Sequence, residues 1–191
     1  LSKADAIADI RPGLATSWAP VEGEPTKWVF KLREGVKFHD GSDFDADAVV
    51  WNLDKVLNDK SPQFDSKQLA QVRARIPTLV GYKKIDKHTV ELTTRIVNSL
   101  FPYDMSYVFY SSPANWEKQG KDWNKVALQP SGTGPFKVDR VVPRERMELS
   151  RNADYWEKTR VPKLDKVILF PMPEAATRTA ALLAGQVDWI E

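Results

Sequence analysis

The segment LQPSGTGPFKVDRVV, residues 128–142, contains a glycine-rich turn. Such a turn binds phosphate when a strand precedes it and a helix with a Lys-Ser or Lys-Thr pair follows it, because backbone N–H groups and the lysine then surround the anion. Here the residues after the glycines alternate as in a strand, and no such pair follows. The order is reversed, so we interpret Gly132-Thr133-Gly134-Pro135 as a structural turn that leads into a strand.

Three closely spaced aspartates, Asp43, Asp45 and Asp47, look like the beginning of a calcium-binding loop. That loop needs glycine at its sixth position and glutamate at its twelfth, and these positions hold Ala48 and Asp54. We therefore interpret the cluster as carboxylates at the N-terminus of a helix, where the helix dipole favours negative charge. The sequence predicts no metal site here.

Residues for catalysis are sparse. The two histidines, His39 and His88, have no metal-type spacing, and no nucleophile-elbow motif accompanies them. Cysteine is absent, which excludes disulfides and thiol catalysis. His39, beside Asp40, is interpreted as a turn residue. A secreted α/β hydrolase or carbohydrate-active enzyme is the alternative from another class, and it would need a Ser–His or paired-carboxylate site.

An aromatic segment is more indicative of binding, and it contains Phe101, Tyr103, Tyr107, Phe109 and Tyr110. Core packing is the alternative interpretation for any one of them. Three tyrosines within eight residues nevertheless exceed what one small core readily hides, and aromatic rings with polar tips line small-molecule clefts. If residues 107–111 run extended, Tyr107 and Phe109 share one face with Ser111, while Val108 and Tyr110 share the other.

Composition limits the classes of protein. With 191 residues, 42% of them hydrophobic, the chain can bury the core of one large domain or two small ones. The net charge of +2 is too weak to indicate nucleic acid or a membrane surface as a partner. No apolar stretch approaches the roughly 20 residues of a membrane helix, and the first residues do not have the pattern of a signal peptide. Thirteen prolines and seven tryptophans indicate a loop-rich α/β protein.

Alternation of apolar and polar residues predicts the strands that would position these groups. They are expected at 27–33, 89–93, 136–142, 146–150 and 166–170, the third and fourth forming a hairpin. The last is a continuous apolar run, which is typical of a central strand. Residues 11–18 are interpreted as an irregular lead-in.

Helical spacing and capping residues predict three helices. One covers residues 44–57, with Asp45 as its N-cap and Phe44 packing on Val49. A short helix begins at Pro113 after the cap Ser112. The third covers residues 174–184 and ends at Gly185. Residues 58–77 are expected to be part loop and part helix.

Three stretches in register resemble one family. They are LATSWAPVEGEPTKWVFKLREGVKFHDGSDFDADAVVWNLDKVL, SGTGPFKVDRVVPRERMELSRNADYW and AALLAGQVDWIE. Their order and spacing are similar to those of family 5 extracellular solute-binding proteins, the peptide- and nickel-type receptors of ABC importers. The resemblance covers nearly the whole chain.

The resemblance implies an α/β fold of the periplasmic-binding-protein type (type II, cluster C), represented here by part of the first lobe with mixed sheets and flanking helices. Residues 1–110 would form the peripheral subdomain of lobe one and residues 111–191 part of its core subdomain. Family members begin with a further strand, and they continue into a second lobe that is absent here.

The function implied by the resemblance is capture of a solute, most simply a dipeptide or oligopeptide, for delivery to an ABC permease in the membrane. Nickel chelates, sugars and haem are the alternatives within the family. The protein would be a bacterial monomer in the periplasm or on the extracellular face of the cytoplasmic membrane. It would be no enzyme and would need no cofactor, metal or nucleic acid.

The resemblance also points to solute-contacting residues, namely Phe64, Tyr107 and Phe109. In the family, the strand before the Ser-Pro turn borders the cleft, and a nickel-binding relative has a ligand-contacting arginine where Phe109 stands. The segment after the first long helix supplies an aromatic ring that covers the solute, and SPQF, which ends in Phe64, corresponds to it. The alternative is that Phe64 and Phe109 pack inside the lobe.

Overall fold

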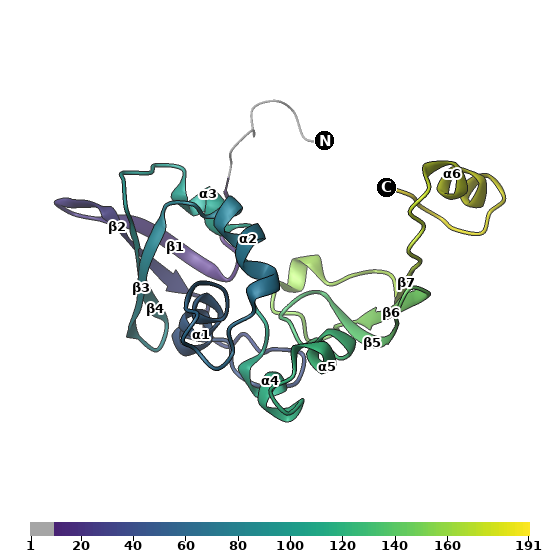
Figure 1. Cartoon of the computed structure of the whole chain (residues 1–191), viewed down its shortest axis with the longest axis horizontal. Helices are drawn as coiled ribbons and strands as arrows, with labels where there is room; N and C mark the ends of the chain where they lie inside the picture. Colours follow the sequence, from purple (N-terminus) through teal and green to yellow (C-terminus); the bar gives the residue numbers. More distant parts are fainter. Residues whose placement is uncertain (1–9) are drawn as a thin grey trace.

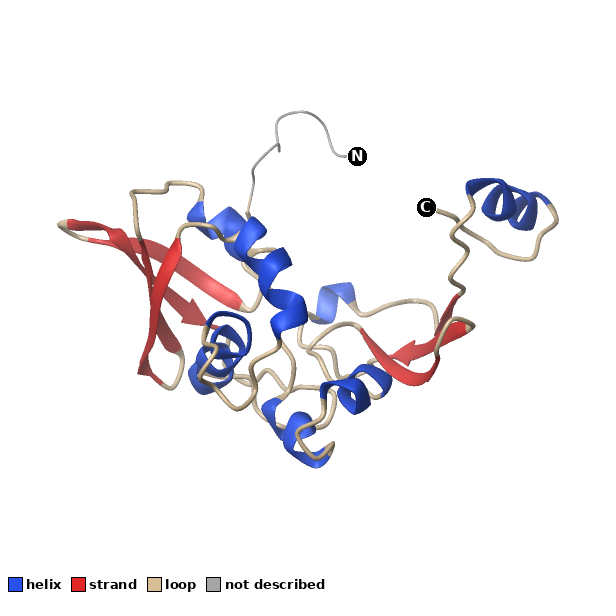
Figure 2. Cartoon of the chain, in the orientation of Figure 1, coloured by secondary structure: helices blue, strands red, loops and turns tan. Residues whose placement is uncertain are grey.

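The computed structural model describes residues 10–191. Two antiparallel sheets lie at opposite sides of the view in Figure 1, and short helices connect them along the lower side. Figure 2 shows the same arrangement with the strands in red and the helices in blue. The chain is therefore a mixed α/β structure, as the sequence predicts.

The first sheet contains four strands in the order β1-β2-β4-β3. Their bounds are Ala15–Val21 for β1, Glu24–Leu32 for β2, Leu79–Asp86 for β3 and Thr89–Thr94 for β4. The predicted strands at 27–33 and 89–93 are confirmed as β2 and β4. Their buried side chains meet across the pair, Phe30 opposite Val90 and Trp28 opposite Leu92, which is the packing that stabilises a sheet.

The interpretation of residues 11–18 as an irregular lead-in is wrong. Residues 15–21 form β1, which pairs with β2 along its length. Most β1 side chains are exposed, because this strand lies at the sheet edge. An edge strand is stabilised by backbone hydrogen bonds more than by a buried face, so its sequence lacks a clear alternation.

Helix α1, Ala46–Leu57, packs its apolar face on this sheet, and Val49 and Leu53 are buried in the core. The Asp45 side chain accepts a hydrogen bond from the Ala48 N–H at 3.1 Å, which confirms the predicted N-cap. Phe44 is buried in the same hydrophobic cluster as Val49. Helix α2, Ser66–Arg75, follows with Asp65 as its cap.

Three short helices lead from the first sheet to the second: α3 Phe101–Met105, α4 Pro113–Lys118 and α5 Trp123–Leu128. Pro102 lies in the first turn of α3, where a missing N–H is tolerated. The predicted start of α4 is confirmed, because the Ser112 side chain accepts from the Asn115 N–H at 3.0 Å and Pro113 opens the helix.

The second sheet has the order β5-β6-β7, with β5 at Phe136–Val142, β6 at Arg146–Arg151 and β7 at Lys166–Leu169. The predicted hairpin is confirmed as β5 and β6. The prediction that residues 166–170 form a central strand is wrong, because β7 lies at the edge and Ile168 and Leu169 are each 48% exposed. A continuous apolar run indicates two faces available for burial, but within residues 10–191 β6 is the one strand that pairs with β7.

After β6, a 3₁₀ turn at Lys158–Arg160 precedes β7, and the last helix, α6, covers Ala175–Leu183. The prediction of a helix at 174–184 is confirmed, and Gly185 ends it with a φ of 68°. Helix α6 stands apart from both sheets in Figure 1. No helix among residues 10–191 is long and apolar enough to cross a membrane.

The three aspartates of the DFDAD segment bind different partners. Asp43 pairs with Lys37, Asp47 pairs with Lys84 at 2.6 Å, and Asp45 caps α1. We expect Asp45→Ala to lower the free energy of unfolding by about 1 kcal/mol through loss of the cap. Asp45→Asn keeps an acceptor and should lose much less. Urea denaturation measures both, and a melting temperature that rises on addition of calcium would contradict the capping role.

Candidate functional site

The predicted site residues Tyr107 and Phe109 follow α3. Tyr107 lies in the turn that ends the helix, since its N–H donates to the Asp104 carbonyl at 3.2 Å. The extended alternation predicted from residue 107 therefore does not include Tyr107, because the turn hydrogen bonds that follow α3 involve the N–H groups of both Tyr107 and Val108, the latter donating to the Met105 carbonyl at 3.2 Å. Phe109 faces outward, whereas Val108 and Tyr110 pack against the hydrophobic core.

Phe109 is 76% exposed. This exposure excludes the alternative that its ring packs inside the core formed by residues 10–191. The neighbouring Tyr110 turns the other way and packs edge-to-face on Phe44, with ring centroids 5.3 Å apart, and burial raises the pKa of its hydroxyl. Phe109 is thus an aromatic ring held at the surface by a segment whose other residues are anchored.

The anchor is Asn52 of α1, which is 1% exposed. Its Nδ2 donates to the Ser111 carbonyl at 2.9 Å, and its Oδ1 accepts from the Ser111 N–H at 2.8 Å. The side-chain amide therefore pairs with the Ser111 backbone as a neighbouring strand would. Lys55, one turn further along α1, donates to the Ser111 hydroxyl at 3.2 Å. Burial lowers the pKa of Lys55 to about 8, and the charge of Asp65 opposes this shift.

Phe64 lies in the loop between α1 and α2 and is half-buried. The carbonyl of the preceding Gln63 accepts a hydrogen bond from Trp123 Nε1 at 3.0 Å, which ties this loop to α5. At the other end of α2, the Arg75 guanidinium stands 5.7 Å from the ring centre of Tyr107. A helix of this length spans about 15 Å, so Phe64 and Tyr107 lie near opposite ends of α2 and do not form one cluster.

An open hollow of about 610 Å³ lies beside Phe109. Its floor is made of core residues that include Phe30 and Leu92, and Trp18 and Trp156 line it from β1 and from the segment after β6. Of the three predicted site residues, only Phe109 borders this hollow. Sequence reasoning missed Trp156, although it ends the RNADYW motif and its neighbour Tyr155 is also aromatic.

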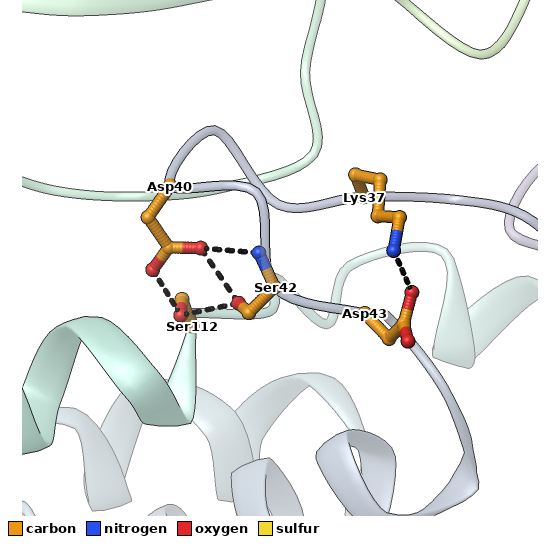
Figure 3. A network of polar contacts seen from close by, with 5 residues as sticks. All are labelled: Lys37, Asp40, Ser42, Asp43 and Ser112. Carbon is orange, nitrogen blue, oxygen red and sulfur yellow. Dashed lines mark hydrogen bonds and ion pairs between the residues drawn. The ribbon is translucent and has the colours of Figure 1, made fainter.

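A network of polar contacts around Asp40 joins the segment after β2 to Ser112, the residue that caps α4 (Figure 3). Asp40 accepts hydrogen bonds from the hydroxyls of Ser42, at 2.6 Å, and Ser112, at 2.5 Å, and its own N–H donates to Ser131 Oγ at 3.1 Å. Burial raises the pKa of Asp40, but the hydrogen bonds from Ser112, Ser42 and Ser131 outweigh it and hold the pKa below its ordinary value.

His39, next to Asp40, joins the same segment to the glycine turn that precedes β5. Its Nδ1 faces the Gly132 N–H at 3.3 Å and its Nε2 faces the Gly134 carbonyl at 2.9 Å. Only neutral imidazole with the proton on Nε2 satisfies both, since it accepts from Gly132 and donates to Gly134. The interpretation of Gly132–Pro135 as a structural turn is confirmed, because it leads directly into β5 and supplies the groups that bind His39.

The fold is similar to that of solved periplasmic solute receptors. A dipeptide-binding protein from Pseudoalteromonas sp. SM9913, in complex with Met-Leu, matches with a TM-score of 0.80 over 96% of this chain and 38% of that protein, at 22% identity. A nickel ABC transporter protein from Bacillus halodurans matches with a TM-score of 0.71 over 92% of this chain and 33% of that one, at 29% identity. The class of fold is thus that of the periplasmic-binding-protein structures.

The family model described as bacterial extracellular solute-binding proteins, family 5 Middle, matches residues 9–191. The chain belongs to this family, as the resemblance of its motifs implies. The glutathione-binding protein GsiB of Escherichia coli (strain K12) is 32% identical over 92% of this chain and 32% of its own length. Di/tripeptide-binding protein 1 of Pseudomonas aeruginosa (strain UCBPP-PA14) is 31% identical over 93% of this chain and 35% of its own length. The chain spans about a third of the length of these relatives.

The Asn52 anchor yields a stability prediction. Asn52→Ala should lower the free energy of unfolding by about 2–4 kcal/mol, because it leaves the Ser111 N–H and carbonyl without partners. The Ser111 amide should also exchange its hydrogen faster. Asn58→Ala is the control, since the Asn58 side chain makes its hydrogen bonds to nearby residues at the C-terminal end of α1, and it should lose about 1 kcal/mol or less. Equal losses in urea denaturation would contradict the anchoring role.

The His39 contacts yield a pH prediction. Burial lowers the pKa of His39 below its ordinary 6.5, against the opposing effects of Gly134 and Asp40. The unfolded chain therefore binds the proton more readily, and stability should fall as the pH drops below about 6.5. His39→Gln, whose amide keeps a donor and an acceptor, should remove most of this dependence. His88→Gln should retain it, and the reverse pattern in melting temperature would contradict the assignment.

Proposed function

We propose that the protein containing this chain is the solute-capturing subunit of an ABC importer and that its solute is a short peptide. The observation that carries this proposal is the family match over residues 9–191, together with peptide-type relatives more than 30% identical. The relatives named after glutathione and after di- and tripeptides support a peptide of two or three residues. Delivery to a membrane permease, a periplasmic or extracellular location and a monomeric state belong to the same proposal.

In this proposal the protein binds the solute and does not change it chemically. Two lobes close on the solute by a hinge motion, and the closed form is presented to the permease. Residues 1–110 act as the peripheral subdomain of the first lobe and residues 111–191 as part of its core subdomain. No bond in the solute is made or broken, so the affinity comes from stacking and hydrogen bonds in a desolvated cleft.

Phe109, Tyr107 and Phe64 are the residues we propose to contact the solute. Phe109 supports this best, because its ring is exposed while the backbone two residues later is held by Asn52. A ring on an anchored segment loses little conformational freedom when a ligand stacks on it. Tyr107 supports it less directly, being 42% exposed in the turn after α3. Phe64 lies further away, at the start of α2.

A nickel chelate is the second candidate, and the solved nickel ABC transporter protein from Bacillus halodurans supports it. Phe109 presents an apolar ring, which favours a peptide side chain over a charged chelate. Binding of Met-Leu against nickel complexes, measured by calorimetry in the longest natural chain that contains this sequence, distinguishes the two. Tighter binding of the nickel complex would overturn the peptide proposal.

In the same protein, Phe109→Ala should weaken peptide binding by about 1–3 kcal/mol if the ring stacks on the solute. It should change the free energy of unfolding little, because the ring is exposed. Ile85→Ala is the matched control, being an exposed apolar residue at the far end of β3. The site assignment fails if Phe109→Ala leaves affinity unchanged or lowers stability by the ~3–5 kcal/mol typical of a buried phenylalanine.

A further inference from the structure

The end of α2 meets the turn after α3 in a small cluster of three side chains, Arg75, Tyr103 and Tyr107, which we call the arginine–tyrosine cluster. The Tyr103 and Tyr107 rings pack edge-to-face with centroids 5.5 Å apart, and their hydroxyls form a hydrogen bond of 2.8 Å. The Arg75 guanidinium lies over the Tyr107 ring at 5.7 Å. The cluster is exposed and adjoins Phe109, two residues after Tyr107.

The cluster presents hydrogen-bond donors that the chain does not use. Within residues 10–191, no carboxylate forms an ion pair with Arg75, and its interaction is the stacking on Tyr107. Asp104, the acid between the two tyrosines in sequence, accepts from Asn98 Nδ2 at 2.9 Å. In a hydroxyl pair only one of the two protons lies between the oxygens, so the second O–H remains a donor.

Protonation keeps these donors in place. The hydrogen bond with Tyr103 and the charge of Tyr103 raise the pKa of Tyr107, and the charge of Arg75 opposes this shift in part. The Tyr107 hydroxyl therefore stays protonated at neutral pH. Helix α2 itself contains Lys67, Arg73 and Arg75 and no acidic residue. The C-terminal end of α2 is therefore positively charged, whereas Asp104, whose charge also acts on Tyr107, is hydrogen-bonded to Asn98. A group that only accepts hydrogen bonds fits the donors of the cluster best.

A helix-capping role does not account for this geometry. Basic residues in the last turn of a helix interact favourably with the dipole, and this applies to Arg73 and Arg75 alike. Of these two, only Arg75 lies over an aromatic ring, with its guanidinium carbon 5.7 Å from the centre of the Tyr107 ring. A guanidinium held in this way is suited to a planar acceptor that takes two parallel hydrogen bonds.

We propose that the arginine–tyrosine cluster binds a carboxylate of the solute, with Arg75 as a specificity-determining residue. The inference rests on the proposed peptide-binding function and adds the chemical group of the solute that the arginine–tyrosine cluster recognises. Phe109 lies two residues after Tyr107, so the backbones of the two residues are at most about 7 Å apart. A dipeptide can therefore place a side chain on Phe109 and its terminal carboxylate on Arg75. A side-chain carboxylate of an acidic residue presents the same chemistry.

The experiment is calorimetry in the longest natural chain that contains this sequence, with three probes: Met-Leu, its C-terminal amide, and Glu-Leu amide. Arg75→Gln should weaken binding of the carboxylate-bearing probe by about tenfold or more, a change of ~1.4 kcal/mol. Binding of Met-Leu amide should be weak in the unchanged protein and unaffected by the substitution. A loss for Met-Leu identifies the terminal carboxylate, and a loss for Glu-Leu amide identifies the side-chain carboxylate.

Arg73→Gln is the matched control, because it removes the same charge from the same turn of α2 without touching the cluster. Equal effects of the two substitutions, or an equal loss for Met-Leu and its amide, would overturn the carboxylate assignment and leave the peptide function standing. Failure of the unchanged protein to bind any of the three probes would overturn the peptide function and this inference with it. Melting temperatures of both variants show whether the fold is retained.

Discussion

The polar contact of His39 and Asp40 with the segment before α4 and the segment after α5 is the interaction on which the rest of the structure depends. The two sheets share no strand, so the hydrogen bonds of Asp40 with Ser112 and Ser131, and those of His39 with the glycine turn, hold the two parts together. These bonds are directional and need neutral imidazole beside ionised carboxylate. A junction of this kind specifies one relative placement, which apolar packing alone does less sharply.

Helix α1 connects the first sheet to the backbone of the candidate site. Its apolar face packs on the first sheet, and its Asn52 side chain pairs with the Ser111 backbone just before α4 begins. Phe109 can therefore be exposed and yet well positioned, because its neighbours Val108 and Tyr110 are packed and Ser111 is hydrogen-bonded. Binding residues on a short loop that a rigid scaffold holds are a common arrangement in receptors.

The elements that could be predicted are those with strong local signals. The capped start of α1 at Asp45, the Ser112-Pro113 start of α4 and the β5–β6 hairpin each depend on residues close in sequence. Strand β1 was missed and β7 was placed wrongly, because pairing partners and edge position are non-local. For the candidate site, the outward orientation of Phe109 was predictable from alternation. The position of Tyr107 was not, because its N–H takes part in the turn that ends α3.

By itself, the sequence determined the class of fold, the family and the absence of local motifs for phosphate or calcium binding in the GTGP and DFDAD segments, because motif order and spacing carry that information. Only the tertiary structure decided that His39 binds the glycine turn, 93 residues away from Gly132. It alone decided that Asn52 anchors Ser111 and that Arg75 stacks on Tyr107. Each of these contacts joins residues far apart in the chain, and their approach depends on how α1, α2 and the sheets pack, which no local pattern specifies.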